Sequence, residues 1–386
     1  MQAYARSGDS QNNPWLDLVR ALAILLVMLR HGERALHTET GSPQGFLQMI
    51  FMNGWIGVDL FFVLSGYLIA RHLIRAGIGR GEFRLGRYIA MRALRIFPAY
   101  YAVLLLTAAG AFPLVQVSTD ALGLRVAYHL LFLQDYLPSD INVVFWSLGV
   151  EEKFYVLAPL LILTLLHCRN VHSRLAVLLS LFALPIALRA AIFLPAARVF
   201  DYPEFWRIFR SPFHMALEGL IVGVGIALAE HAGLVRRARV AGLAVLACSI
   251  LALTIWTGSH EFMAEIGLAD AVFQPPLIAF LAGMVTLGGV LLAGTPMPFS
   301  APVQLVARLS YSLYLIHYPL LPMAVAVALP YGSGAFWIFF FAVSLLGGGI
   351  LHLAIERPFL RWKDRLAHKR SPTGEPAIDR PAKAAG

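Results

Sequence analysis

Apolar stretches of close to 20 residues recur along the whole chain, with short polar segments between them. A helix needs about 20 apolar residues to cross a hydrocarbon core roughly 30 Å thick. A further apolar stretch at 126–136 is too short to cross, so it predicts a re-entrant or interfacial helix. The pattern predicts an all-α integral membrane protein, a bundle of about ten transmembrane helices, with spans at residues 15–33, 54–70, 96–115, 146–167, 175–194, 213–231, 240–258, 274–293, 305–329 and 335–355.

Composition supports the membrane assignment. Of the 386 residues 59% are hydrophobic and 14% are charged, whereas about a quarter are charged in an average soluble domain. The formal net charge is +9, but the basic residues lie in short loops and no zinc finger or recognition helix accompanies them. We therefore expect a lipid bilayer and no nucleic acid as partner. Cys168 and Cys248 are far apart and indicate neither a disulfide framework nor a metal site.

Lys and Arg residues predict the orientation. With the N-terminus inside, the predicted cytoplasmic segments hold 21 of them and the opposite segments hold 5. The positive-inside rule then places both termini in the cytoplasm. We divide the chain into a polar N-terminus at 1–14, a membrane domain at 15–360 and a basic tail at 361–386. The tail is rich in Pro, Ala and charge, and we expect it to be disordered.

The first span carries two polar residues that need an explanation, Arg20 and His31. They are eleven residues apart, so they project from one helix face about 16 Å apart along the axis. The functional interpretation is a site that uses both. The alternative is an arginine that extends to the interface and a histidine at a helix end.

Seven arginines lie within residues 71–95, beginning with Arg71. Arg92 and Arg95 are three apart and therefore share one side of a helix. Paired guanidinium groups suit phosphate binding, and Arg71 begins the same arginine-rich segment. The alternative is a loop that only sets topology and attracts anionic lipid.

The fourth span begins with W-S-L-G-V-E-E-K-F-Y, which puts Glu151, Glu152 and Lys153 just inside an apolar helix. Neighbours along a helix point in different directions, so the three cannot all line one pocket. We expect at least one of them to face the interior of the bundle.

These motifs occur together with G-V-D-L-F-F-V-L-S-G-Y-L-I, R-A-L-R-I-F-P-A-Y-Y, S-Y-S-L-Y-L-I-H-Y-P-L and a closing E-R-P. In this order, from about residue 15 to 360, the chain resembles the bacterial membrane acyltransferase family three. Members of that family transfer acetyl or other short acyl groups from acyl-coenzyme A to sugars of O-antigen, exopolysaccharide, glucans or glycosylated small molecules. By position, the resemblance implies that His31 is the essential histidine and Arg20 its R-x10-H partner.

The resemblance further implies that Arg92 and Arg95 are the cytoplasmic R-x-x-R pair. Glu151 and Glu152 match the family's acidic pair, although Lys153 stands where its members usually have glutamine. We therefore assign catalytic roles to His31, Arg20, Glu151 and Glu152, and donor binding to Arg92, Arg95 and Arg71.

The resulting hypothesis is an O-acyltransferase that spans the bacterial inner membrane many times. It binds no resident cofactor or metal and uses acyl-coenzyme A, with acetyl-coenzyme A favoured, as co-substrate. The acceptor is a hydroxyl of a surface or exported glycan, and proteins of glycan assembly are candidate partners. His31 acts as general base, or alternatively as a transient acyl carrier. A transporter or flippase is the competing class, although we find no inverted repeat. A purely structural membrane subunit is the third option.

Overall fold

The computed structural model describes residues 13–40, 45–81, 83–196, 198–260 and 265–368. Within these ranges the named elements are all helical, and one isolated antiparallel bridge joins Phe200 to Ile266. The long helices are α1 (Pro14–Thr40), α3 (Gly57–Arg75), α4 (Leu85–Ala108), α6 (Trp146–His167), α7 (Val171–Ala196), α9 (Leu217–His231), α10 (Arg239–Ser259), α11 (Gln274–Leu291), α12 (Ser300–Ala328) and α13 (Ser333–Leu351). The shorter ones are α2 (Phe46–Met52), α5 (Leu122–Leu130), α8 (Tyr202–Phe205) and α14 (Arg357–His368).

Each predicted span coincides with one of the long helices, so the all-α class is confirmed. The third span is displaced, because the predicted segment 96–115 corresponds to a helix that begins at Leu85 and ends at Ala108. Gly110, with a left-handed φ of 72°, lies just past that end. In the described part of the chain, seven helices are long and apolar enough to cross a membrane. The other three predicted spans correspond to α1, α6 and α9, so the count of ten stays a prediction.

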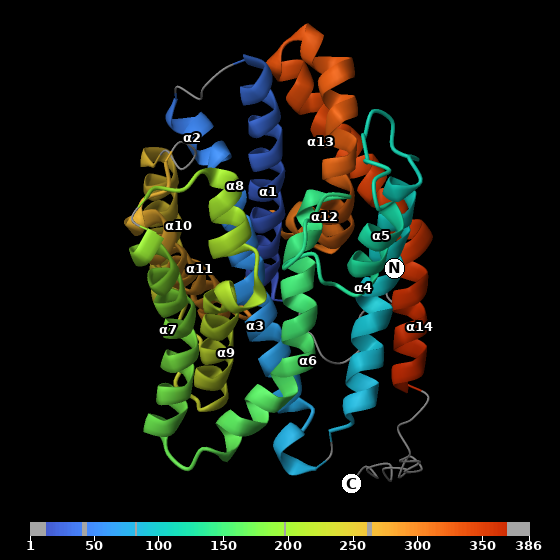
Figure 1. Ribbon diagram of the computed structural model, residues 1–386. Helices are drawn as coiled ribbons and strands as arrows, with labels where there is room; N and C mark the ends of the chain where they lie inside the picture. The colour runs from blue at the N-terminus through green and yellow to red at the C-terminus, as the bar shows by residue number, and fades with distance from the viewer. Residues whose placement is uncertain (1–12, 41–44, 82, 197, 261–264, 369–386) are drawn as a thin grey trace.

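Helix α3 lies at the centre of the bundle, with α1, α6, α9 and α11 packed around it, and α12 joins α1 to α13 (Figure 1). Small residues let these helices approach closely. A side chain at Gly66 would collide with the Leu220 carbonyl of α9, and one at Gly223 with the Val63 carbonyl of α3. Such backbone contact is typical of membrane helix pairs, in which glycine replaces a side chain at the crossing point.

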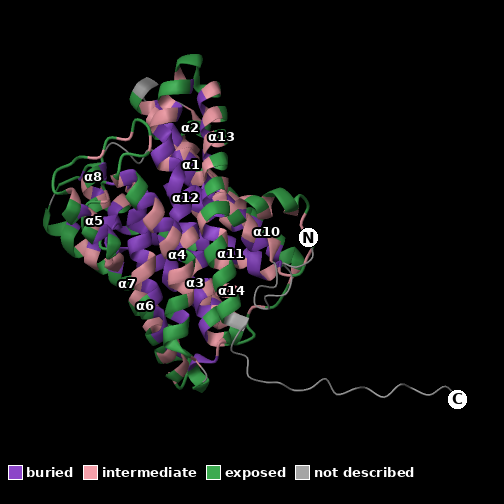
Figure 2. Cartoon of the chain, turned by 90° about the vertical axis from the view of Figure 1, so that its right-hand side faces the viewer, coloured by how far each residue is buried: buried purple, intermediate pink, exposed green. Residues whose placement is uncertain are grey.

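Burial follows the layers of the bundle, with buried residues along the central helices and exposed residues toward the periphery (Figure 2). Leucine and isoleucine dominate the exposed outer faces of the peripheral helices, for example Leu179 on α7, Leu251 on α10 and Ile338 on α13. An apolar outer face around a packed interior is the arrangement that lipid requires.

Buried ion pairs hold the helices together. Arg210 donates to Asp59 of α3 at 2.7 Å, and both side chains are 2% exposed. Arg189 of α7 pairs with Glu218 of α9 in the same way. Breaking a buried pair by removing one partner typically costs about 3–5 kcal/mol, because the other charge is then left uncompensated. These charges are structural, and they account for part of the intramembrane polarity that the sequence shows.

The ends of the bundle are distinct. In Figure 1 the turns after α3 and α6 lie at the bottom, while the end of α1 and the turn between α12 and α13 lie at the top. Which side is cytoplasmic stays a prediction. The predicted domain boundary at residue 360 falls within α14, and the tail beyond residue 368 and the N-terminus before residue 13 lie outside the described residues. Residues 126–136 contribute to the short helix α5 and the turns that follow it.

Candidate active site

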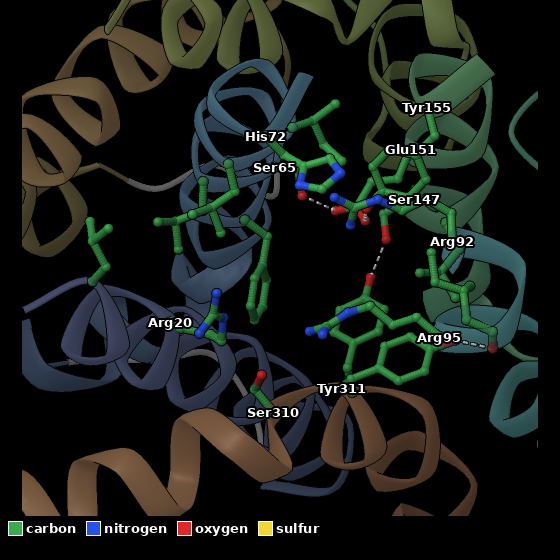
Figure 3. Close-up of a pocket in the computed structure, with 18 of the residues that line it drawn as sticks. Arg20, Ser65, His72, Arg92, Arg95, Ser147, Glu151, Tyr155, Ser310 and Tyr311 are labelled. Atoms are coloured by element: carbon green, nitrogen blue, oxygen red, sulfur yellow. Dashed lines mark hydrogen bonds between the residues drawn. The ribbon is translucent and has the colours of Figure 1, made fainter. Parts of the chain in front are cut away.

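A cavity of 470 Å³ opens between α1, α3, α4, α6 and α12 (Figure 3). Five arginines contribute to its lining, and they are Arg20, Arg71, Arg75, Arg92 and Arg95. We call it the arginine cavity. The sequence-predicted donor residues Arg71, Arg92 and Arg95 therefore share one cavity, and Arg20 joins them from α1. Such a concentration of guanidinium groups attracts a polyanionic ligand.

The arginines differ in how far their charge is already compensated. Arg20 forms an ion pair with Asp17 at 3.0 Å, and Arg71 forms one with Glu230 of α9 at 3.2 Å. Arg92 and Arg95 form no ion pair with any described residue. Arg75 likewise forms none, so the positive charges of Arg75, Arg92 and Arg95 are the ones most available to a ligand.

Helix α4 explains the geometry of the pair. Arg92 and Arg95 are three residues apart in the first half of this helix, and both point into the cavity. The Arg92 guanidinium lies over the rings of Tyr88 and Tyr155, 5.9 and 5.3 Å from their centroids. These cation–π contacts hold the side chain in place without neutralising it.

The two predicted glutamates are consecutive residues of α6, so their side chains point in different directions. Glu151 lines the arginine cavity and accepts hydrogen bonds from Ser65 at 3.1 Å and Tyr155 at 2.6 Å. Glu152 does not line it, and its buried Oε1 has no hydrogen-bond partner in the described part of the chain. Lys153 points elsewhere again and pairs with Asp135 at 2.6 Å. The expectation that the three charges diverge is confirmed.

His31 lies outside the lining of the arginine cavity, further along α1. Its Nδ1 is 2.9 Å from Nε2 of His317 on α12, and its ring meets Tyr318 edge-on at 5.2 Å. The sequence analysis gave His317 no role. Its position inside an apolar helix and within the S-Y-S-L-Y-L-I-H-Y-P-L motif could have singled it out, but its partner is 286 residues away.

The hydrogen bonds of His317 define the tautomer of His31. The carbonyl of Leu313 can only accept, so Nδ1 of His317 carries the proton that bonds to it at 2.9 Å. In the neutral pair, Nε2 of His317 must then accept a hydrogen bond from Nδ1–H of His31. This leaves Nε2 of His31 with a lone pair. His31 can therefore accept a proton at its Nε2 atom.

Tyr314 lies between His317 and the arginine cavity, with Phe61 beside it. Phe61 and Tyr314 both line the cavity and meet edge-on at 6.0 Å. On its other side Tyr314 is 6.0 Å from the His317 ring. Its hydroxyl donates to the Val144 carbonyl at 2.9 Å and is bonded to Ser147 at the start of α6 at 2.5 Å. The histidine pair and the arginine cavity are thus neighbouring parts of one helical bundle, and Tyr314 contacts both.

Comparison of the sequence with known protein families identifies the family of this chain. A family model described as an acyltransferase domain matches residues 13–353. The chain belongs to this family, the acyltransferase 3 family, and carries an acyltransferase domain. No solved structure matches the chain.

Curated relatives agree with the assignment. The chain is 25% identical over 350 residues to peptidoglycan O-acetyltransferase OatA of Listeria monocytogenes, covering 81% of the chain and 50% of the relative. It is 27% identical over 360 residues to the putative peptidoglycan O-acetyltransferase YrhL of Bacillus subtilis, covering 86% and 52%. Putative O-acetyltransferases of Staphylococcus aureus match 40% of the chain at 28% identity. The chain spans about half, or less, of the length of these relatives.

Proposed function

We propose that this acyltransferase moves an acetyl or other short acyl group from acyl-coenzyme A to a hydroxyl of a surface or exported glycan. The observation that carries the proposal is the arrangement along α1. Arg20 lies in the arginine cavity, and His31, with a free Nε2, lies eleven residues further along, about 16 Å by helix geometry. One helix thus joins a polyanion-binding cavity to a proton acceptor.

The arginine cavity is the proposed donor site. Coenzyme A carries several phosphate charges, and guanidinium groups bind phosphate through charge-assisted, often bidentate hydrogen bonds. Arg92 and Arg95, together with Arg75, supply uncompensated charge, and Arg71 shares its charge with Glu230. The acyl-pantetheine arm would extend from these arginines past Phe61 and Tyr314, which brings the thioester toward His31.

The proposed reaction balances with groups already present. Nε2 of His31 takes the proton of the acceptor hydroxyl as its oxygen attacks the thioester carbonyl. The new C–O bond forms, the C–S bond breaks, and coenzyme A leaves as a thiolate, which takes the proton from Nε2 of His31 and becomes the thiol. The alternative is attack by Nε2 itself, which forms an acyl-histidine that the hydroxyl then cleaves. Both routes need the same unprotonated nitrogen.

The names of the relatives support an acetyl donor and a glycan acceptor, with peptidoglycan added to the candidates. The chain spans only about half of those relatives, so the acceptor is not carried over from them. The bacterial inner membrane, with the arginine-rich end of the bundle facing the cytoplasm, is the proposed location. It places the cavity where coenzyme A is found.

Thiol release tests the proposal directly. The purified chain is given acetyl-coenzyme A with and without soluble N-acetylglucosamine oligomers and peptidoglycan glycan strands, and free thiol and O-acetyl groups are quantified. Glycan-dependent thiol release that is lost in His31→Ala supports it. Uptake of glycan into sealed vesicles without thiol release would instead favour the transporter alternative.

A further inference from the structure

Helices α3 and α9 place a carboxylate next to one of the cavity arginines. Tyr67 and Arg71 are four residues apart on α3 and therefore share a face of that helix. On α9, Gly223 approaches the α3 backbone so closely that a side chain there would collide with it, and Glu230 lies two turns further on the same face. The helix crossing thus brings Glu230 to Tyr67 and Arg71.

Glu230 joins Tyr67 to Arg71. Its Oε2 atom lies 3.2 Å from Nε of Arg71 and accepts a hydrogen bond from the Tyr67 hydroxyl at 2.7 Å. The Arg71 guanidinium lies 5.7 Å from the centroid of the Tyr67 ring. Tyr67 is 1% exposed, so packing holds both its ring and its hydroxyl in place. Arg71 lines the arginine cavity and the other two residues do not, so they contact it from outside the cavity.

The ion pair uses only one edge of the Arg71 guanidinium. Its Nε atom is buried, on the side of Glu230. The Nη1 and Nη2 atoms form no hydrogen bond with any residue that the structure describes, and, unlike Nε, neither is buried. Arg20 differs, because its Nη1 atom donates to Asp17 at 3.0 Å. The two terminal nitrogens of Arg71 thus stay available for a bidentate bond to phosphate.

Charge by itself does not explain a carboxylate at this position. A negative charge beside the cavity weakens the attraction between its arginines and a polyanion. A long arginine side chain, however, loses rotamer freedom when it binds a ligand, and a side chain that is held in advance loses less. Glu230 and Tyr67 hold Arg71 in this way, which indicates a geometric role for the carboxylate.

We propose that Glu230 is a positioning residue of the donor site, which together with Tyr67 holds Arg71 by its Nε edge and turns Nη1 and Nη2 toward a phosphate of the acyl donor. This inference rests on the proposed function, because it takes the arginine cavity as the site of acyl-coenzyme A. Glu230 acts on the donor only through Arg71. Removing Glu230 should therefore weaken donor binding, although it removes a negative charge that repels the donor.

Donor binding without turnover tests this role. The affinity of the full chain in detergent for acetyl-coenzyme A is measured by titration calorimetry in the absence of any glycan. We expect Glu230→Ala to weaken binding roughly 3- to 10-fold. Glu230→Gln keeps an oxygen near Nε of Arg71 and should weaken binding less. The matched control is Glu204→Ala, which removes a carboxylate of similar exposure from its ion pair with Arg198; neither residue lines the cavity, so binding should match the wild type.

A second substitution separates positioning from packing. In an Arg71→Ala background, Glu230→Ala should cause no further loss of affinity, since Glu230 then has nothing to position. A further loss of the same size in that background would overturn the inference, and so would binding by Glu230→Ala that is equal to or tighter than that of the wild type. If Glu230→Ala lowers thermal stability, Tyr67→Phe keeps the ring, loses the hydroxyl and supports the same comparison; unchanged affinity in it would also overturn the inference.

The outcomes distinguish this inference from the proposed function. Absence of glycan-dependent thiol release by a wild-type chain that binds acetyl-coenzyme A would reject acyl transfer to glycans, while the affinities of the variants still decide the role of Glu230. Absence of acetyl-coenzyme A binding by the wild-type chain would overturn the inference together with the donor site.

Discussion

His317 offers the sharpest test of the proposed chemistry, because its role depends on one hydrogen bond. The bond from Nδ1–H of His31 to Nε2 of His317 keeps the proton on Nδ1 and the lone pair on Nε2. Without an acceptor at His317, this hydrogen bond is lost and a larger share of His31 carries its proton on Nε2, although the backbone of Val27 still forms a hydrogen bond with the ring. His317 is thus a positioning residue that acts through His31.

The magnitude follows from the strength of that bond. A neutral hydrogen bond contributes about 0.5–1.5 kcal/mol net, which corresponds to roughly 2- to 12-fold in the ratio of the competent to the other tautomer. Loss of the base itself should cost about 10²–10⁴-fold. The competent population itself falls less than that tautomer ratio, so we expect His317→Phe, which keeps a ring but has no acceptor, to lower kcat by roughly two- to fivefold.

Matched variants distinguish positioning from packing. His317→Gln places an amide oxygen near the lost Nε2, so it should recover much of the rate that His317→Phe loses. The assay is glycan-dependent thiol release at matched protein level, with kcat and the KM for acetyl-coenzyme A measured separately. The KM should stay unchanged, since His317 does not line the arginine cavity. A wild-type kcat in His317→Phe, or an equal fall in both variants, would refute the tautomer argument.

Three further predictions concern the donor site, the base and the topology. Arg92→Ala and Arg95→Ala should each raise the KM for acetyl-coenzyme A by roughly tenfold or more, while the KM for the glycan stays unchanged. Normal donor kinetics in both variants would mean that these arginines only set the membrane topology. His31→Ala should lower acyl transfer by about 10²–10⁴-fold without loss of thermal stability, and His31→Gln should be as inactive. Mass spectrometry of glycan acylation measures both variants. In a cysteine-free background, a cysteine in place of the exposed Arg80 should resist an impermeant thiol reagent in whole cells; labelling from outside would invert the predicted orientation.

The sequence alone determined where the helices are and which of them carry charge. Apolar periodicity is a local property, so each predicted span coincides with a helix. The separation of Arg92 and Arg95 by three residues already placed both on one face of α4, and the structure points both into one cavity. The displaced third span shows the limit of this reasoning, because the amphipathic first half of α4 is helical without being apolar.

Only the tertiary structure decided which polar groups meet. The sequence offered Arg20 and His31 as a pair on one face, but the bundle puts Arg20 in the arginine cavity and joins His31 to His317 on α12. Likewise, it orients Glu151 into that cavity and leaves Glu152 outside. The physical reason is that helix periodicity depends on neighbours along the chain, whereas these contacts depend on how helices distant in sequence pack against one another.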